Sequence, residues 1–523
     1  MGFTFQINKD VQFCRNEQLL EKAQACIPQL HHTEVFPQRY VKAVDDAGML
    51  GGIGVRETAA PEDALGKGDT VILDFGRHVT GSFSAHIDHH GSPMDAPLWL
   101  KIRFAEVPFE LTSDINAYDG WLSSSWIQEE SVHMDVLPAE LVLSRRYSFR
   151  YVMITVMDTS PKWKVSFDRI SVQAVSSAPE VYEPLQVHDD MLRKIADVST
   201  ATLAECMQEV FEDGPKRDRR LWLGDLRLQA LADYAVFGET DIVRHCMYLF
   251  AAMTASDGRI SANVFTSPDY QPDDSFLFDY SLFLTSVLYD YERFRYDEET
   301  LRDLYPVCRQ MMVYARTFVD EDGCLRLPEE YPVFIDWSDA FDKSTAGQAV
   351  MIFVLRQFIE LAGLCGEDAG EWQDLLARME RYAVQELFDE NTGMFVSGAH
   401  KEINIASQVW MVLAGVLDHA HNHELMRKAV QELFPVHGIA TPYMYHHIVQ
   451  ALFEAGLDDE AVSLMKAYWG KMIAMGADTF WEAFDPERPE YSPYGSPVVS
   501  SFCHAWSCTP VWLIRKYINR EEF

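Results

Sequence analysis

The sequence predicts two domains, a β-rich domain over about residues 1–185 and a mostly helical domain over residues 186–523. Three observations predict this division. The chain has 523 residues, which exceeds the length at which one hydrophobic core usually stops growing. The hydrophobic pattern changes from a strand-like to a helical period near residue 185. In the second part, similar turns follow successive helical patterns, which favours helical hairpins arranged around an axis.

The first domain is predicted from short apolar or alternating runs that turn-forming residues separate. These runs include residues 71–75 (VILDF), 98–104 (LWLKIRF) and 151–156 (YVMITV). β-branched and aromatic residues are frequent in them, and a period of two is typical of strands. We therefore expect a β-rich unit before residue 185.

The second domain is predicted from apolar residues at helical spacing. One such stripe consists of Leu375, Leu376, Met379, Tyr382, Ala383 and Leu387. Gly258, Gly323 and Gly393 lie 65 and 70 residues apart, each in a turn after a helical run. An α-solenoid would give the same signal, but this spacing is longer and less regular than that of common solenoid repeats. A closed ring of paired helices is favoured.

Composition and charge restrict the classes of partner. With 48% hydrophobic and 12% aromatic residues, the chain can build large cores. Its formal net charge of -36 repels phosphate backbones and anionic lipid surfaces, so neither nucleic acid nor a membrane is an expected partner. No apolar run reaches the roughly 18 residues of a membrane span, and residues 1–13 lack a basic segment followed by an apolar core. A cytoplasmic location is expected.

The cysteines indicate neither a disulfide framework nor a metal site. There are nine, an odd number, scattered along the chain without a CxxC pair. Thiols in a reducing compartment fit this distribution. Cys503 and Cys508 form one isolated pair, which is no metal signature. We expect no metal and no cofactor.

Residues 212–225 (EDGPKRDRRLWLGD) interrupt a helical pattern with acids, arginines and a tryptophan. Carboxylates can exchange protons at a glycosidic oxygen, arginine can hold carboxylates or hydroxyls, and an indole can cover a sugar ring. Because the chain contains 80 Asp and Glu residues, two acids a few positions apart could instead lie on a solvated helix face. However, Gly214-Pro215 ends the helix and residues 221–223 are too apolar for a fully solvated loop. The segment is interpreted as a loop that faces a cavity.

Several motifs resemble the α-L-rhamnosidases of glycoside hydrolase family 78. Residues 73–81 (LDFGRHVTG) resemble its DFGxNxxG turn, residues 104–106 (FAE) its YAE and residues 149–152 its FRYV. The resemblance extends from about residue 65 to the carboxyl end. It implies an antiparallel β-sandwich over residues 1–185 followed by an (α/α)6 barrel, or toroid, over residues 186–523.

Residues 213–225 resemble the family's loop DCPxRDERxGWTGD, in which the glutamate is the general acid. The matching residues are Asp213, Pro215, Arg217, Trp222, Gly224 and Asp225. The chain is one residue shorter between Arg217 and Asp225 and has no glutamate there. A gap directly after Arg217 gives the acid's position to Asp218. The other placement would put Arg219 there, and a guanidinium cannot donate a proton near neutral pH.

Residues 479–485 (TFWEAFD) resemble the family's TTxWExWD, which implies that Glu482 is the general base. Residues 501–505 (SFCHA) resemble SxNH, whose histidine contacts the sugar, and this corresponds to His504.

Two further segments are implied for the pocket. Residues 334–338 (FIDWS) resemble the family's GDW, which implies that Trp337 packs on the sugar with Asp336 beside it. Residues 275–280 (SFLFDY) stand where many members carry WGD, so Asp279 is a candidate, and Phe276 and Phe278 lie where tryptophan is frequent.

The resemblance implies an inverting, exo-acting α-L-rhamnosidase that releases rhamnose from a small-molecule or oligosaccharide rhamnoside. Asp218 would protonate the leaving oxygen and Glu482 would activate a water, with the two carboxyl groups roughly 6.5 to 9.5 Å apart. The implied substrate-binding residues are Asp213, Arg217, Trp222, Asp225, Asp279, Asp336, Trp337 and His504.

Two alternatives stay open. One is another (α/α)6 glycosidase that acts on a different terminal sugar or an unsaturated uronide, and the other is a non-catalytic sugar-binding relative. The sequence leaves the aglycone, the linkage and the oligomeric state open, and a homodimer is compatible with it.

Overall fold

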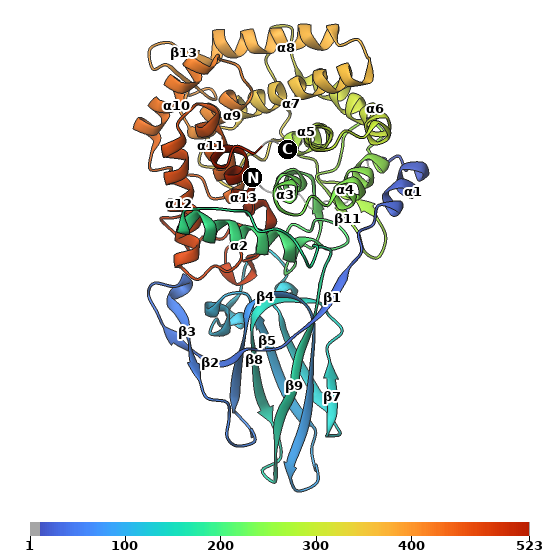
Figure 1. The fold of residues 1–523 in the computed structure, drawn as a ribbon, viewed down its shortest axis with the longest axis vertical. Coiled ribbons are helices and arrows are strands. Elements are labelled where there is room, and N and C mark those ends of the chain that lie inside the picture. Colours follow the sequence, from blue (N-terminus) through green and yellow to red (C-terminus); the bar gives the residue numbers. More distant parts are fainter. Residues whose placement is uncertain (1–10, 522–523) are drawn as a thin grey trace.

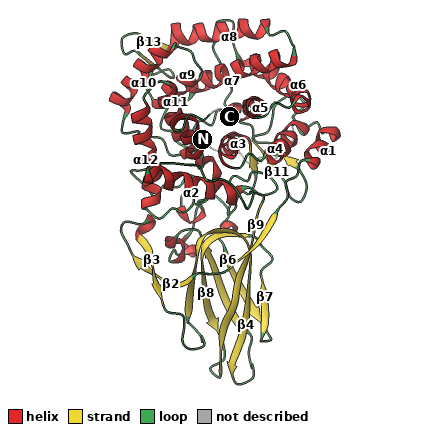
Figure 2. Cartoon of the chain, in the orientation of Figure 1, coloured by secondary structure: helices red, strands yellow, loops and turns green. Residues whose placement is uncertain are grey.

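The computed structural model describes residues 11–521, in which a strand-rich part is followed by a helical part. Figure 1 shows the strands at one end of the long axis and the helices at the other. Figure 2 shows the same division by secondary structure. We call the part that contains strands β1–β9 the β domain and the part that contains helices α2–α13 the helical domain. The predicted order, an antiparallel β domain before a helical domain, is confirmed.

The β domain is one antiparallel sheet. Its path runs β1-β9-β4-β8-β5-β6, with β2 and β7 also paired to β4, and β3 paired to β2. The strands are β1 His31–Val35, β2 Arg39–Asp45, β3 Ile53–Thr58, β4 Thr70–Gly91, β5 Leu98–Ala105, β6 Glu129–Met134, β7 Ala139–Val142, β8 Tyr147–Asp158 and β9 Trp163–Ser176. Alternate residues along β5 and β8 are buried in a common apolar core, as the alternating sequence pattern requires.

Strand β4 is long because a bulge lets it bend and continue. Its register against β8 shifts between Asp74 and Val79. Gly76 has φ +77° there, a conformation that glycine adopts without strain. The Asp74 carboxylate accepts hydrogen bonds from the Gly76 N–H at 2.8 Å, Arg39 Nη2 at 2.7 Å and Arg150 Nε at 2.9 Å. The motif therefore fixes the bend by pairing one fully buried carboxylate with two arginines.

The helical domain consists of paired helices. They are α2 Asp190–Cys206, α3 Leu223–Val236, α4 Thr240–Ala252, α5 Phe278–Phe294, α6 Glu298–Ala315, α7 Ser344–Cys365, α8 Gly370–Tyr382, α9 Ile405–Leu413, α10 His419–Leu433, α11 Pro442–Glu454, α12 Asp458–Ala474 and α13 Pro510–Leu513. Short strands lie between them: β10 Leu221–Trp222, β11 Asn263–Phe265, β12 Gln271–Pro272, β13 Phe388–Asp389 and β14 Met394–Phe395.

The odd-numbered helices contact one another in cyclic order. Helix α3 packs on α5, α5 on α7, α7 on α9, α9 on α11, α11 on α13, and α13 returns to α3. The even-numbered helices α6, α8, α10 and α12 pack outside them, as Figure 1 shows. Helix α11 is buried over all of 442–453, which agrees with a helix that is surrounded by others. Helix α7 is the one helix within residues 11–521 long and apolar enough to cross a membrane, and 61% of its most apolar window is buried inside the domain.

The three glycine turns predicted after helical runs are present in the helical domain. Gly258, Gly323 and Gly393 have φ values of +99°, +97° and +66°, so each forms a turn in a conformation that favours glycine. At Gly323 a Cβ atom would lie 2.5 Å from the Arg378 carbonyl oxygen, so the close approach also requires glycine. All nine cysteines are free thiols.

The amino-terminal helix differs from the expectation that residues 1–185 form one β-rich unit. Helix α1, Glu17–Ala25, packs on α4, and its apolar side chains Leu19, Leu20 and Ala23 belong to the core of the helical domain. An amphipathic helix must bury its apolar stripe, and α1 buries it against α4.

Asp74→Ala is expected to destabilise the β domain by about 3 to 5 kcal/mol, because Arg150 would lose a buried partner. Urea unfolding followed by circular dichroism measures this loss. Asp95→Ala is the matched control, since Asp95 pairs with Lys162 on the surface of the same domain and its removal should change stability little. A loss for Asp74→Ala no larger than that of the control would contradict the structural role.

Candidate active site

A cavity of about 110 Å³ lies where loops of the helical domain meet the β domain. Eight of the ten residues predicted for the site line it. They are Asp213, Arg217, Asp218, Trp222, Asp225, Trp337, Glu482 and His504. Residues far apart in the sequence, such as Asp218 and Glu482, therefore line the same cavity.

The segment that carries the acids is a closed loop. The Asp213 N–H donates to the Arg220 carbonyl at 3.0 Å, and the Arg220 N–H returns a hydrogen bond to the Asp213 carboxylate at 3.1 Å. Between them, Asp218 and Arg219 have φ values of +62° and +55°. Left-handed conformations of non-glycine residues cost of order 1 kcal/mol or more each, and they are concentrated at functional sites.

The shortened loop turns two neighbouring side chains in different directions. Asp218 lines the cavity. The Arg219 guanidinium leaves it and donates to the Pro215 carbonyl at 2.8 Å and the Arg146 carbonyl at 2.7 Å. The structure thus puts Asp218, and not Arg219, beside the other acids.

Glu482 is held from three sides. Arg217 donates to its Oε2, the Tyr494 hydroxyl donates to its Oε1, and the Ser501 N–H lies 3.4 Å from Oε2. Burial raises the pKa of this carboxyl, but the Arg217 guanidinium, the neighbouring His504 and the hydrogen bonds from Tyr494 and Arg217 outweigh it and hold the pKa below its usual range. Glu482 is therefore ionised near neutral pH and can accept a proton.

Arg217 connects the two carboxylates. Its Nη1 lies 3.4 Å from Asp218 Oδ1, while its Nη2 contacts Glu482. The guanidinium also donates from Nε to the Val499 carbonyl at 2.9 Å, and its centre lies 4.2 Å from the centroid of the Tyr494 ring. Because Arg217 is 1% exposed, these contacts replace its water shell.

Two further acids in the cavity have raised pKa values. Burial, followed by the charges of Asp218 and Asp225, raises the pKa of Asp213 well above its usual range. Burial also raises the pKa of Asp225, opposed by His504, whose Nε2 lies 3.2 Å from Asp225 Oδ1. Carboxyl groups that stay protonated can donate hydrogen bonds to sugar hydroxyls.

Aromatic side chains form the walls. Trp222 and Trp337 line the cavity as predicted, and Phe334 stacks on Trp506 with ring centroids 5.8 Å apart. The Trp222 indole N–H is buried and has no hydrogen-bond partner among the described residues. At Gly224 a Cβ atom would lie 2.3 Å from the Tyr280 ring, so glycine permits α3 and α5 to approach at the cavity wall.

The β domain supplies residues that the sequence did not predict. Trp121, Leu122 and Trp126, in the loop between β5 and β6, line the same cavity. The Trp121 indole donates to the Pro493 carbonyl at 3.3 Å, beside Tyr494. Two tryptophans in a polar, turn-rich segment were the one available signal, but nothing local indicates which domain they face. Other lining residues that sequence reasoning missed are Arg220, Leu277, Tyr280, Phe334, Tyr494 and Trp506.

Asp279 and Asp336 do not line this cavity, although Asp336 lines an adjoining one that shares Trp121, Phe334 and Trp337 with it. Asp279 accepts hydrogen bonds from the N–H groups of Phe334 and Ile335 at 2.9 and 3.0 Å. Asp336 accepts from the N–H groups of Ser338 at 2.7 Å and of Ala440 and Thr441 at 3.1 Å each. Backbone donors saturate both carboxylates, so they position the segment that carries Phe334 and Trp337.

Ile335 explains why this segment needs such support. Its φ of +56° is unfavourable for a β-branched residue, and its N–H is fixed by Asp279. Phe276 and Phe278 also lie outside the cavity, whereas Leu277 and Tyr280 of the same run line it. Phe276 stacks on Phe13 and Phe278 contacts Tyr331. Within residues 11–521, no group of three or more His, Cys, Asp or Glu side chains is arranged to hold a metal ion.

The sequence matches two family models. Residues 37–174 match the glycosyl hydrolase family 78 alpha-rhamnosidase N-terminal domain. Residues 184–518 match the bacterial alpha-L-rhamnosidase 6 hairpin glycosidase domain. The second match alone spans more than half of the chain.

Solved structures agree with this match. A rhamnosidase from Klebsiella oxytoca with rhamnose bound is 44% identical, with a TM-score of 0.93, and the match covers 97% of this chain and 100% of that one. The family 78 rhamnosidase of Bacillus sp. GL1 is 19% identical with a TM-score of 0.73, over 88% of this chain and 49% of that one. The Streptomyces avermitilis α-L-rhamnosidase complexed with L-rhamnose is 18% identical with a TM-score of 0.67, over 94% and 44%.

The last two structures share the fold at low identity, whereas the first is close in both sequence and length. A comparison with curated protein sequences gave no match. The two family models and the similarity to the Klebsiella oxytoca enzyme over nearly the whole chain show that this chain belongs to glycoside hydrolase family 78, the α-L-rhamnosidases, and is a glycosidase.

Proposed function

We propose that this chain is an inverting, exo-acting α-L-rhamnosidase that releases terminal L-rhamnose from small glycosides. The observation that carries the proposal is the pair Asp218 and Glu482, which face one cavity and share the guanidinium of Arg217. The rhamnose bound to the 44% identical Klebsiella oxytoca rhamnosidase supports rhamnose as the sugar.

The chemistry assigns one role to each carboxyl group. Asp218 donates its proton to the glycosidic oxygen as the bond from that oxygen to the anomeric carbon breaks. Glu482, ionised because Arg217 and His504 stabilise its charge, takes a proton from a water whose oxygen bonds to the anomeric carbon. The aglycone leaves as an alcohol and the sugar leaves with a new hydroxyl group. Tyr494 and Arg217 hold the two oxygens of Glu482 in place during this step.

Inversion follows from the resemblance of the Asp218 and Glu482 segments to the acid and base motifs of the family. Arg217 contacts Asp218 through Nη1 and Glu482 through Nη2, so one guanidinium lies between the two carboxyl groups. Inverting pairs lie roughly 6.5 to 9.5 Å apart, whereas retaining pairs lie about 5 to 5.5 Å apart.

Exo action on small glycosides is supported by the lining of the cavity. Acids and aromatic rings form its walls, a lining that suits one sugar ring at a chain end. Trp121 and Trp126 of the β domain line it as well, and their indoles offer flat apolar surfaces for an aglycone.

We infer that the fold is a β-sandwich followed by an (α/α)6 toroid. The cyclic contact order of the helices α3, α5, α7, α9, α11 and α13 supports the toroid. An unsaturated uronide is disfavoured as the substrate because the cavity's arginines are engaged: Arg217 by Glu482, and Arg220 over the Phe265 ring at 4.2 Å.

Asp218→Asn and Glu482→Gln are each expected to lower kcat by about 10² to 10⁴ while rhamnose still binds. Both changes keep shape and remove proton transfer, and asparagine tolerates the left-handed backbone of residue 218 as well as aspartate does. Steady-state kinetics with p-nitrophenyl α-L-rhamnoside and calorimetric titration with rhamnose measure the two effects. Wild-type turnover in Asp218→Asn would transfer the acid role to Asp213 or Asp225.

Asp213→Asn should keep kcat within about tenfold of wild type, because the loss of an acid or base costs more. It should also stabilise the protein at neutral pH. The raised pKa of Asp213 means that folding takes up a proton above the unfolded pKa of about 4, which costs stability there and costs nothing below it. Melting temperatures across this range should show a gain for Asp213→Asn that shrinks as the pH falls. A gain that grows toward low pH would contradict the assignment.

The first product should be β-L-rhamnose. Proton NMR of a fresh reaction, before mutarotation, reads the anomeric configuration, and α-rhamnose as the first product would refute inversion. A panel of p-nitrophenyl glycosides tests the sugar at the same time: preferred hydrolysis of the α-L-rhamnoside is expected, and preference for another terminal sugar would overturn the proposed substrate.

A further inference from the structure

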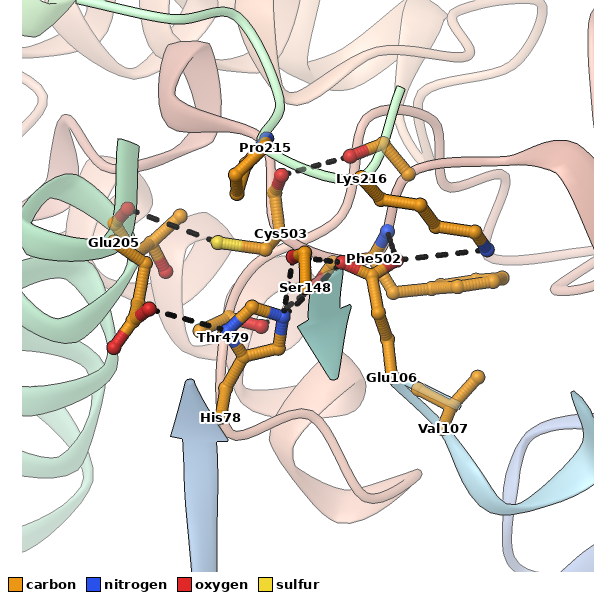
Figure 3. Close-up of polar contacts among 12 residues, drawn as sticks. His78, Glu106, Val107, Ser148, Glu205, Pro215, Lys216, Thr479, Phe502 and Cys503 are labelled. Atoms are coloured by element: carbon orange, nitrogen blue, oxygen red, sulfur yellow. Dashed lines mark hydrogen bonds and ion pairs between the residues drawn. The ribbon is translucent and has the colours of Figure 1, made fainter. Parts of the chain in front are cut away.

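A buried polar cluster joins the β domain to both catalytic loops. Its centre is Glu106, which follows the end of β5 and is 1% exposed. Figure 3 shows His78 and Ser148 beside Glu106, with Phe502 and Lys216 approaching from the helical domain. His78 Nε2 and the Ser148 hydroxyl each lie 3.1 Å from Glu106 Oε1. The motif that contains Glu106 matched the family as a structural signature, and the mechanism above does not use it.

The second oxygen of Glu106 faces the helical domain. The Phe502 N–H donates to Oε2 at 2.8 Å, and Lys216 Nζ lies 3.7 Å from the same atom. Lys216 is itself buried, contacts Glu110 and donates to the Ser500 carbonyl at 2.9 Å. One carboxylate of the β domain thus contacts two separate loops of the helical domain.

Each of these loops carries catalytic groups next to the contact. Lys216 directly precedes Arg217, which binds Glu482, and Asp218 follows. On the other loop, Ser501 precedes Phe502. The Glu482 N–H donates to the Ser501 carbonyl at 3.0 Å, and the Ser501 N–H lies 3.4 Å from Glu482 Oε2. Two residues after Phe502, His504 contacts Asp225. A shift of either loop would therefore move the acid and the base relative to each other.

We propose that Glu106 is a positioning residue for the hydrolysis proposed above, since it fixes the acid loop through Lys216 and the base through Phe502. The β domain then contributes to catalysis by positioning the acid and the base. An unpaired buried charge is strongly unfavourable, so Glu106, Lys216 and His78 hold one another in a single arrangement. Burial raises the pKa of Glu106, but Lys216 and His78 outweigh it and lower the pKa, so the carboxylate keeps its charge.

Glu106→Gln is the informative variant. It keeps the shape and the acceptor for Phe502 but removes the charge opposite Lys216. Because small misplacements of reacting groups can cost up to 10²-fold, kcat for p-nitrophenyl α-L-rhamnoside should fall by about 10- to 10²-fold. The inhibition constant of free rhamnose should change much less, since the residues that line the cavity around the sugar are unchanged.

The pH profile gives a readout that a loss of stability alone would not move. If the loops shift, Arg217 stabilises the Glu482 carboxylate less, the pKa of Glu482 rises, and the acidic limb of kcat/KM moves to higher pH. The ionisable groups that face Glu482 from the surrounding loops are Arg217, Asp218, Asp225, Tyr494 and His504.

Two control variants separate positioning from general damage. Glu130→Gln makes the same change at a carboxylate of the β domain that pairs with Arg145 and Tyr147 and contacts neither loop. Ile87→Ala removes buried apolar volume from the sheet and lowers the melting temperature without touching the loops. Both should keep wild-type kcat and the wild-type pH profile well below their melting temperatures.

The outcomes are distinct. Wild-type kcat and pH profile in a folded Glu106→Gln protein overturn the inference while rhamnosidase activity stands. If Glu106→Gln gives no cooperative melting transition, Ser148→Ala, which removes one hydrogen bond to the same carboxylate, decides instead: a lowered kcat supports positioning and an unchanged kcat overturns it. If the wild-type protein cleaves no rhamnoside, the proposed function fails, and the positioning role of Glu106, which rests on that function, fails with it.

Discussion

The buried guanidinium of Arg217 is the constraint on which the rest of the site depends. A charge removed from water must be fully paired, and its partners here are Glu482, Asp218, a backbone carbonyl and an aromatic ring. Two of these partners, Glu482 and Val499, lie more than 260 residues further along the chain. The cyclic arrangement of helices returns that late segment to the early one, so closure of the ring and formation of the ion pair require each other.

The environment of this pair divides acids of the same chemical type into different states. Beside Arg217 the pKa of Glu482 is lowered, whereas burial raises the pKa values of Asp213 and Asp225. A chain with a net charge of -36 can thus concentrate carboxyl groups in one cavity without having all of them ionised together. The acid loop matters because it brings Asp213, Arg217 and Asp225 into the same cavity as Glu482.

Much of this could be predicted from the sequence, and the limits have physical reasons. The change of hydrophobic period predicted the two parts, and the chemistry of guanidinium predicted that Asp218 rather than Arg219 would face the cavity. The roles of Asp279 and Asp336 could not be predicted, because a motif does not indicate which backbone N–H groups come within reach of a carboxylate. The contribution of Trp121 depends on contact between domains, which no local pattern encodes.

Helix α1 affects how the two domains can move. It packs on α4 of the helical domain, and a few residues later the chain enters the sheet as β1, paired with β9. The covalent connection between β9 and α2 provides the second crossing. Because the chain crosses between the domains twice, the domains cannot bend freely about a single linker. The place of the Trp121 loop at the cavity is therefore set by two crossings of the chain and not by one linker.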